Sequence, residues 1–179
     1  IPPPFIDFRC SGRGHLWPGR PWIRTGAPGY GAPAKRRHMK LYAHRGASAD
    51  APENTIPAFD LALDQGANGI ELDIWCSGDG VPVVIHDTTL ERTTNGYGAV
   101  KETPLEALQQ LDAGGGATIP SLEEVLLRYA GRTAWLLELK DQDAAKPVAA
   151  LIQRLVAEGA YDVSALMVIG GLHDAVITT

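Results

Sequence analysis

The chain has 179 residues, of which 45% are hydrophobic and 21% are charged, a balance typical of a single globular domain. No hydrophobic run approaches the ~18 residues of a membrane-spanning helix, so we expect no stable membrane insertion. The net charge is -5, and the segment beyond residue 38 carries nine basic and 20 acidic side chains. Such an acidic segment binds phosphate backbones poorly, so we expect no nucleic-acid partner.

Residues 1–38 differ in composition from the rest of the chain. They hold seven of the 16 Lys and Arg residues and one acid, and they are rich in Pro and Gly without hydrophobic periodicity. We interpret them as a disordered or non-native N-terminal extension, with Met39 as an alternative start. They contain no hydrophobic core of a secretory signal, and two cysteines are too few for a disulfide framework. We therefore expect a cytoplasmic protein, while organelle targeting by residues 1–38 stays open.

Hydrophobic strands and helical patterns alternate along the rest of the chain. The first helix is expected to begin after the capping residues Asn54 and Thr55, and the second at a capping box of Ser121 and Glu124. Strands joined by helices through short links predict a parallel α/β sheet, and a barrel and an open doubly wound sheet both fit this order. The expected strands are 41–43, 69–75, 81–85, 133–139 and 165–169.

Ionisable side chains lie on or directly after four successive strands. The carboxyl ends of parallel strands meet at one edge of a sheet, so we expect these groups to share one rim. In chain order they are His44, Glu71, Asp73, His86, Glu138 and Lys140.

The three carboxylates of this set favour a metal site. Glu71 and Asp73 are two residues apart, so on a strand they share one face, and Glu138 would approach from another strand. Three converging carboxylates repel one another, and a divalent cation removes that penalty. Oxygen ligands without thiolates favour Mg²⁺ or Ca²⁺. By spacing alone, however, solvation of Glu71 and Asp73 on an exposed sheet face is the simpler interpretation.

The cationic and imidazole groups suggest acid–base chemistry on a phosphate. His44 and His86 could act as general acid and general base, and the forked donors of Arg45 suit a phosphate. The alternatives are loop histidines bonded to backbone and an arginine in a surface ion pair. Cys76 has no base beside it in the sequence, so we expect it to be structural.

Several short motifs follow one another between residues 41 and 140. They are Ala43-His44-Arg45-Gly46, Pro52-Glu53-Asn54-Thr55, Ile70-Glu71-Leu72-Asp73, His86-Asp87, Leu90-Glu91-Arg92-Thr93-Thr94, Ile119-Pro120-Ser121-Leu122 and Glu138-Leu139-Lys140. Together they resemble the opening signature of the glycerophosphodiester phosphodiesterase family. No single tetrapeptide is decisive, but the ordered set with these gaps is highly specific.

This resemblance implies a fold, a site and a reaction. The fold would be a TIM-type (β/α) barrel with a small insertion after the third strand, about residues 88–118. The chain would hydrolyse glycerophosphodiesters, as small-molecule substrates, to glycerol 3-phosphate and an alcohol with the help of Mg²⁺ or Ca²⁺. The implied roles are metal ligands for Glu71, Asp73 and Glu138, acid–base catalysis for His44 and His86, and phosphate binding for Arg45 and Lys140.

Two features depart from the family pattern. We count five strands where such a barrel needs eight, and residues 170–179 do not resemble the family's continuation. Residues 39–179 are therefore expected to form a partial barrel, truncated after about five strands. One alternative is an inactive fragment or pseudoenzyme that only binds metal or a phospho-ligand. Another is the same barrel acting on lysophospholipid or sphingomyelin head groups. The oligomeric state stays open.

Overall fold

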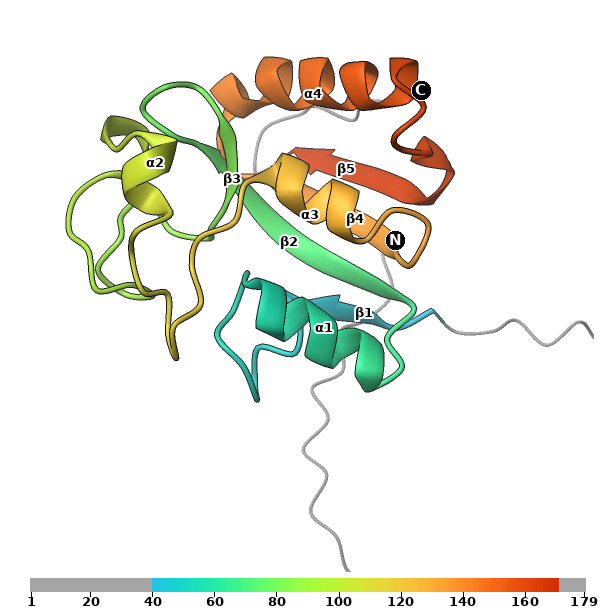
Figure 1. The fold of residues 1–179 in the computed structure, drawn as a ribbon, viewed down its shortest axis with the longest axis horizontal. Helices are drawn as coiled ribbons and strands as arrows, with labels where there is room; N and C mark the ends of the chain where they lie inside the picture. The colour runs from blue at the N-terminus through green and yellow to red at the C-terminus, as the bar shows by residue number, and fades with distance from the viewer. Residues whose placement is uncertain (1–39, 171–179) are drawn as a thin grey trace, which may run out of the picture. The chain divides into compact units, whose positions relative to one another are not determined.

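The computed structural model describes residues 40–170, so the predicted extension at 1–38 and the tail at 171–179 lie outside the described residues. Strands and helices alternate within this range (Figure 1). The strands are β1 (Tyr42–His44), β2 (Gly69–Cys76), β3 (Pro82–Val84), β4 (Ala134–Leu139) and β5 (Leu166–Gly170). The helices are α1 (Ile56–Asp64), α2 (Leu105–Leu108), α3 (Leu122–Arg128) and α4 (Ala145–Ala157), with short 3₁₀ turns at Val100–Glu102, Gln142–Ala144 and Val163–Ala165.

Four of the strands form a parallel sheet in the order β1-β2-β4-β5. The longest pairing joins β2 to β4, from Gly69 opposite Ala134 to Ile74 opposite Leu139. Parallel strands need a crossover between them, and α1 and α4 supply it for β1-β2 and β4-β5. The predicted parallel α/β sheet is therefore confirmed.

The third strand corrects the sequence-based topology. β3 runs antiparallel to β2, with Ile74 opposite Val84, and it is not a further parallel strand of the sheet. The reason is the length of the link, because residues 77–81 are too few for a crossover and suffice only for a tight hairpin. β4, and not β3, therefore pairs in parallel with β2 on the side away from β1.

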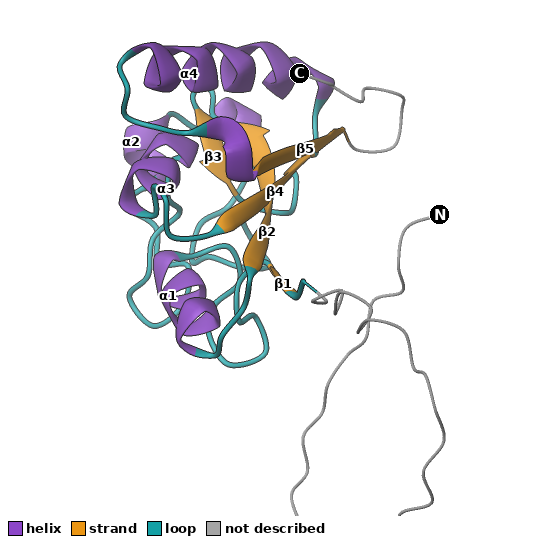
Figure 2. Ribbon diagram, turned by 90° about the vertical axis from the view of Figure 1, so that its right-hand side faces the viewer, coloured by secondary structure: helices purple, strands orange, loops and turns teal. Residues whose placement is uncertain are grey.

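Alternation along the strands divides the sheet into two chemically different faces. Ile70, Leu72 and Ile74 of β2 are fully buried in the main hydrophobic core. That core includes residues of α1, α3 and α4, and Figure 2 shows these helices on one side of the sheet. Glu71 and Asp73, between the hydrophobic residues, point to the other face. One strand thus supplies both the core and the candidate site.

The insertion after β3 has a small hydrophobic core of its own. This second cluster anchors residues 88–118 against β3, in the part of Figure 1 that carries α2. It fixes the position of a segment that otherwise consists mainly of turns. The buried residues of the cluster are Val83, Ile85, Leu90, Val100, Leu108, Ala113 and Ile119.

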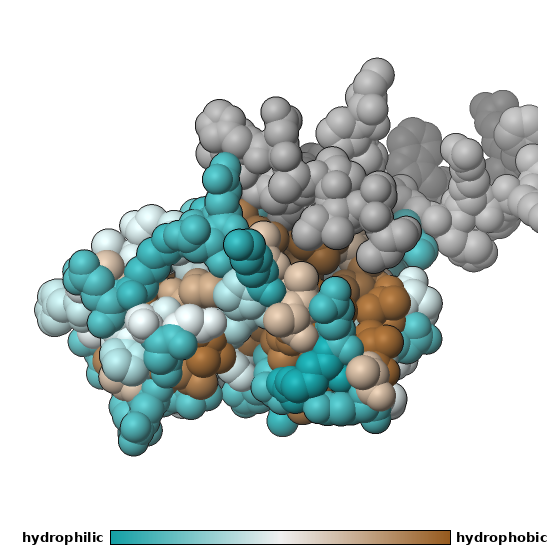
Figure 3. Space-filling model, turned by 90° about the horizontal axis from the view of Figure 1, so that it is seen from above, coloured by the Kyte–Doolittle hydropathy of each residue, from teal (hydrophilic) through white to brown (hydrophobic). Residues whose placement is uncertain are grey.

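The surface is mixed in character. Figure 3 shows hydrophilic residues over much of the view from above, with hydrophobic residues reaching the surface in places. Met167 on β5 and Leu41 before β1 are the most exposed aliphatic side chains, 53% and 57%, within the described range. Among the helices described, none is long and apolar enough to cross a membrane.

The two predicted helix starts differ in their chemistry. At α3, the Ser121 hydroxyl accepts a hydrogen bond from the Glu124 backbone N–H at 3.1 Å, as the capping box predicts. At α1, Thr55 is the N-cap residue by position, but its hydroxyl donates to the Pro52 carbonyl instead. Asn54 reaches away from the helix toward Asp73. The predicted capping role of these two side chains is therefore wrong, and Asn54 belongs to the site.

Two glycines with nearly the same backbone conformation provide a test of the packing of the loop between β1 and α1. Gly46 has φ +79° and Gly80 has φ +80°. A Cβ on Gly46 would lie 2.8 Å from backbone atoms of Ala58 in α1, whereas a Cβ on Gly80 meets nothing within 4 Å. Both Gly→Ala variants should lose about 1–2 kcal/mol to the left-handed conformation. Gly46→Ala should lose about 1–3 kcal/mol more through overpacking.

Urea unfolding of the two variants measures this difference. Equal destabilisation of Gly46→Ala and Gly80→Ala would contradict the close approach of the Gly46 loop to α1.

Candidate active site

The three predicted carboxylates meet on the face of the sheet that the helices leave free. Asp73 on β2 pairs in register with Glu138 on β4, and Glu71 lies two residues before Asp73. Ligand atoms of the three side chains all lie within 4.8 Å of one another. Glu71 is 5% and Asp73 0% exposed, so the alternative of solvated carboxylates on an open face is wrong for this pair.

Asp73 is the most heavily partnered of these acids. The Arg45 Nε lies 3.1 Å from its Oδ2, and the Lys140 Nζ lies 3.0 Å from its Oδ1. The Asn54 side-chain amide donates to Oδ2 at 2.9 Å. Lys140 also donates to Glu138 at 2.7 Å. Burial alone would lower the pKa of Lys140, but its hydrogen bonds to Glu138 and Asp73 raise it overall. The ammonium therefore stays charged beside the cluster.

Glu71 is less well compensated. Its Oε2 accepts a hydrogen bond from the Arg45 backbone N–H at 3.0 Å, while its Oε1 is buried without a hydrogen-bond partner among the described residues. Burial first, and then the charge of Asp73, raise the pKa of Glu71 to about 7. An orphaned carboxylate oxygen beside two further carboxylates suits a divalent cation, and an all-oxygen donor set suits Mg²⁺ or Ca²⁺.

The loop after β1 holds Arg45 in an unusual backbone conformation. Arg45 and Asn54 have φ values of 59° and 58°, the left-handed region that residues other than glycine seldom adopt. The Asn54 N–H donates to the Arg45 carbonyl at 3.0 Å, which ties the two together. Such strain persists only where the surroundings fix it, and it often marks functional sites. Here it turns the Arg45 side chain back onto Asp73, and this side chain is only 18% exposed.

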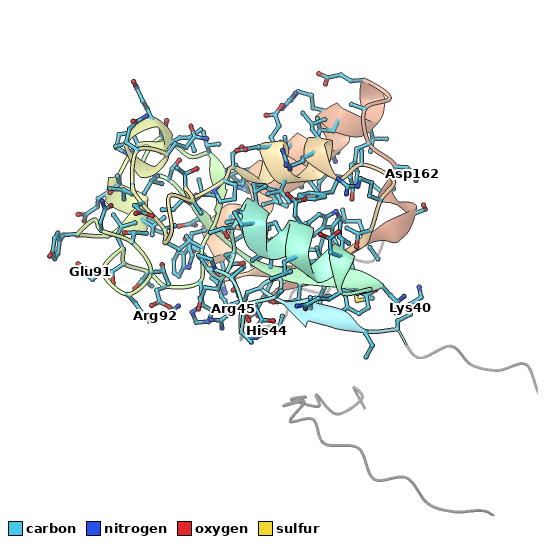
Figure 4. All side chains as sticks on the ribbon, turned by 60° about the horizontal axis from the view of Figure 1, so that its bottom comes forward. Lys40, His44, Arg45, Glu91, Arg92 and Asp162 are labelled. Carbon is cyan, nitrogen blue, oxygen red and sulfur yellow. The ribbon has the colours of Figure 1, made fainter. Side chains whose placement is uncertain are left out.

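His44 and Arg45 lie side by side at the end of β1, with Arg92 nearby along the same edge (Figure 4). The His44 side chain is 56% exposed, and its Nε2 lies 3.9 Å from the Glu71 Oε2. Partial burial and the charge of Arg45 lower the pKa of His44. The imidazole is therefore open to solvent on one side and faces the carboxylate cluster on the other.

His86 is held by its neighbour. Its Nδ1 lies 2.5 Å from the Asp87 Oδ1, and its backbone carbonyl accepts a hydrogen bond from the Trp75 indole at 2.9 Å. The hydrogen bond from Arg92 keeps the pKa of Asp87 well below its usual range. An ionised carboxylate can only accept, so His86 Nδ1 carries a proton, and a ring with one proton then has its acceptor at Nε2. The alternative of a ring bonded to backbone is not what the structure contains.

The β3 hairpin explains how His86 reaches the site. β2 extends past Asp73 to Cys76, and the antiparallel β3 then returns the chain, so that the Ile85 N–H donates to the Asp73 carbonyl at 3.0 Å. His86 follows directly and lines a small pocket together with Glu53 and Asn54. Asn54 of this pocket contacts Asp73, and a hairpin, not the end of a parallel strand, brings His86 to it.

Sequence reasoning missed four polar residues around these groups. All four stand in the family-like motifs of the sequence, and Asp87 directly follows His86, but no local pattern records the pairing of Arg92 with Glu53, 39 residues away. The four are Glu53, Asn54, Asp87 and Arg92.

The surroundings of Arg45 and Cys76 test how the sequence analysis interpreted them, Arg45 as a phosphate-binding group or a surface ion pair and Cys76 as a structural residue. Arg45 is not a surface ion pair, because it contacts the buried Asp73 as well as Glu53. Cys76 is buried in the main core, and burial raises the pKa of its thiol. A protonated thiol in the core is a packing group, which agrees with the structural interpretation.

The sheet, its helices and this cluster define a barrel-type α/β protein with a carboxylate site suited to a divalent cation. Over residues 44–166 the chain matches the model of the Glycerophosphoryl diester phosphodiesterase family. The chain belongs to this family.

Named relatives agree with the family. YhdW of Bacillus subtilis is 44% identical over 133 residues, which make up 70% of this chain and 55% of that protein. A glycerophosphodiester phosphodiesterase of Caldanaerobacter subterraneus is 53% identical over 92 residues, 48% of this chain and 38% of the relative. The chain thus spans about half the length, or less, of the curated relatives it matches.

Solved structures of the family share the fold. The glycerophosphodiester phosphodiesterase of Agrobacterium tumefaciens gives a TM-score of 0.68 at 45% identity, covering 75% of this chain and 58% of that one. An Oleispira antarctica phosphodiesterase, solved with the product sn-glycerol-3-phosphate, gives 0.67 at 33% identity with the same coverage. These neighbours are TIM-type barrels, so the predicted fold class is confirmed, and the chain corresponds to part of such a barrel.

The raised pKa of Glu71 predicts a pH-dependent cost to stability in metal-free solution. The folded chain binds this proton more tightly than the unfolded chain, so stability should fall as pH rises from about 4.5 to about 7. Glu71→Gln keeps the shape and the acceptor for the Arg45 N–H but has no such proton. The variant should be more stable than the parent at pH 8 by about 1–3 kcal/mol.

Urea unfolding in EDTA at pH 8 and at pH 4.5 measures this effect. The difference between parent and variant should shrink at the lower pH. A Glu71→Gln chain less stable than the parent at pH 8 would show that Glu71 is not an uncompensated charge.

Proposed function

We propose that this chain carries the catalytic groups of a metal-dependent phosphodiesterase that hydrolyses glycerophosphodiesters to glycerol 3-phosphate and an alcohol. The observation that carries the proposal is the meeting of three carboxylates with an arginine, a lysine and His44 on the sheet of a family member. A structural neighbour solved with sn-glycerol-3-phosphate supports the substrate class. Residues 39–179 would act as the partial barrel and residues 1–38 as an extension.

The charged residues divide between cation and phosphate. Glu71, Asp73 and Glu138 would hold Mg²⁺ or Ca²⁺, and the orphaned Glu71 oxygen supports this assignment. When bound, the cation would neutralise negative charge on the phosphate oxygens. Arg45 and Lys140 already approach the acids of this cluster, so their remaining donors are placed for phosphate oxygens of a substrate.

Two histidines provide proton transfer in each direction. One imidazole accepts the proton of the attacking hydroxyl or water as the new P–O bond forms. The other donates a proton to the alcohol oxygen as its bond to phosphorus breaks. His86 keeps Nε2 free because Asp87 holds its Nδ1 proton, and His44 is exposed beside Glu71. His44 therefore faces a substrate that binds over the carboxylates, and we expect His86 to reach it from the pocket that it shares with Asn54.

The metal assignment predicts a thermal shift. Saturating Mg²⁺ or Ca²⁺ should stabilise the parent chain by roughly 2.7 kcal/mol at 100 times the dissociation constant. Glu71→Gln should lose most of this gain, because it removes one anionic ligand. Glu124→Gln is the matched control, since Glu124 is an exposed acid on α3 away from the cluster. Thermal unfolding with and without each cation gives the comparison, and an equal shift in both variants would refute the site.

The acid–base assignment predicts loss of turnover. With glycerophosphocholine and the preferred cation, His44→Ala and His86→Ala should each lower kcat by roughly 10²–10⁴-fold, while Glu124→Gln should not. Release of glycerol 3-phosphate is the measurement. Near-normal turnover in either histidine variant would remove that residue from the mechanism.

The same assay separates the competing functions. Cation binding without turnover by the parent chain would favour a protein that only binds metal or a phospho-ligand. Preference for lysophosphatidylcholine or sphingomyelin would replace the substrate class.

A further inference from the structure

Arg92, in the insertion after β3, uses both edges of its guanidinium on two carboxylates. Its Nε and Nη2 donate to Asp87 at 2.5 and 2.9 Å. Its Nη1 and Nη2 donate to Glu53 at 2.9 and 2.8 Å. Asp87 is five residues away in sequence and Glu53 is 39, so the arginine ties the insertion to the loop before α1.

Each of these carboxylates also binds a proposed site residue. Asp87 Oδ1 contacts His86 Nδ1, and Glu53 Oε1 accepts a hydrogen bond from Arg45 Nη1 at 3.0 Å. Arg45 in turn contacts the buried Asp73. A continuous chain of hydrogen bonds and ion pairs therefore runs from the candidate acid–base histidine, through Arg92, to the carboxylate cluster.

The geometry of the guanidinium distinguishes this arrangement from an ordinary surface ion pair. Exposed pairs contribute little on average, and Arg92 is 47% exposed. However, four hydrogen bonds to two carboxylates need the rigid fork of arginine, and a lysine ammonium cannot reproduce them. Without this cation, Glu53 would keep only Arg45 as a cationic partner, and Asp87 would keep only the His86 ring.

We propose that Arg92 is a positioning residue: through Asp87 it fixes the His86 tautomer that leaves Nε2 free, and through Glu53 it holds Arg45 against Asp73. This proposal rests on the proposed function only in assigning His86 a proton to exchange with the substrate. It gives the insertion a direct part in the site, because the insertion supplies the guanidinium that orients two groups outside it.

Arg154 provides a matched control. This arginine, at the end of α4, is 46% exposed and also lies between two carboxylates, Glu123 at 2.8 Å and Glu158 at 3.4 Å. Neither of those acids contacts a proposed site residue among the contacts of the described chain. Arg154→Gln therefore removes the same kind of surface charge without touching the site.

Nitrogen NMR of ¹⁵N-histidine-labelled chain tests the tautomer without any substrate. At pH 8 the parent His86, assigned by its loss in His86→Ala, should carry its proton on Nδ1. Arg92→Gln and Arg92→Lys should shift the ring toward the Nε2–H form, while Arg154→Gln should leave it unchanged. Asp87→Asn should shift it as well, because an amide can donate to Nδ1. An unchanged tautomer in both Arg92 variants would overturn the proposal.

Kinetics separate positioning from folding. With glycerophosphocholine, Arg92→Lys should lower kcat by roughly 10–100-fold, and Arg154→Gln should not lower it. If the Arg92 variants shift the tautomer while the parent chain shows no turnover, the positioning role stands and the proposed function is refuted. Loss of folded histidine signals in both Arg92 variants would assign Arg92 to the fold and overturn the proposal.

Discussion

The buried carboxylate of Asp73 is the constraint that organises the whole site. A fully buried charge is costly unless it is paired and hydrogen-bonded, and Asp73 is 0% exposed. Three residues compensate its charge: Arg45 and Asn54 in the loop after β1, and Lys140 after β4. The left-handed backbone of that loop and the register of β2 with β4 bring these partners to Asp73.

The same strand shows why core and site cannot be separated. Ile70, Leu72 and Ile74 pack on the helices, so the pleat directs Glu71 and Asp73 to the opposite face. A shift of one residue in register would place the acids in the core and the hydrophobic residues at the site. Hydrophobic burial, which is the larger force, therefore fixes the electrostatics. The raised pKa of Glu71 is the residual cost that pairing with protein groups does not remove.

Sequence patterns predicted what depends on local periodicity. The strand alternation around Glu71 and Asp73, the parallel sheet and the capping at Ser121 all follow from neighbouring residues. The antiparallel β3 was missed because strand-end reasoning ignored the short link after Cys76. The partners of Arg92 were missed for a different reason, since 39 residues separate it from Glu53 and no local pattern records such a contact. The roles of His44 and His86 stay predictions.

The insertion shows how a segment with little regular structure can take part in a precise arrangement. Its hydrophobic cluster packs on Val83 and Ile85 of the β3 segment, directly before His86. The same packing that orders the insertion therefore also fixes the backbone from which His86 and Asp87 project. Arg92 binds Asp87 after the hairpin and Glu53, which in turn binds Arg45. The position of Arg92 therefore depends on both the hairpin and the loop after β1. The sheet, the insertion and the loop after β1 are thus coupled through charge as well as through packing. A change in any one of them should alter the contacts of Asp73.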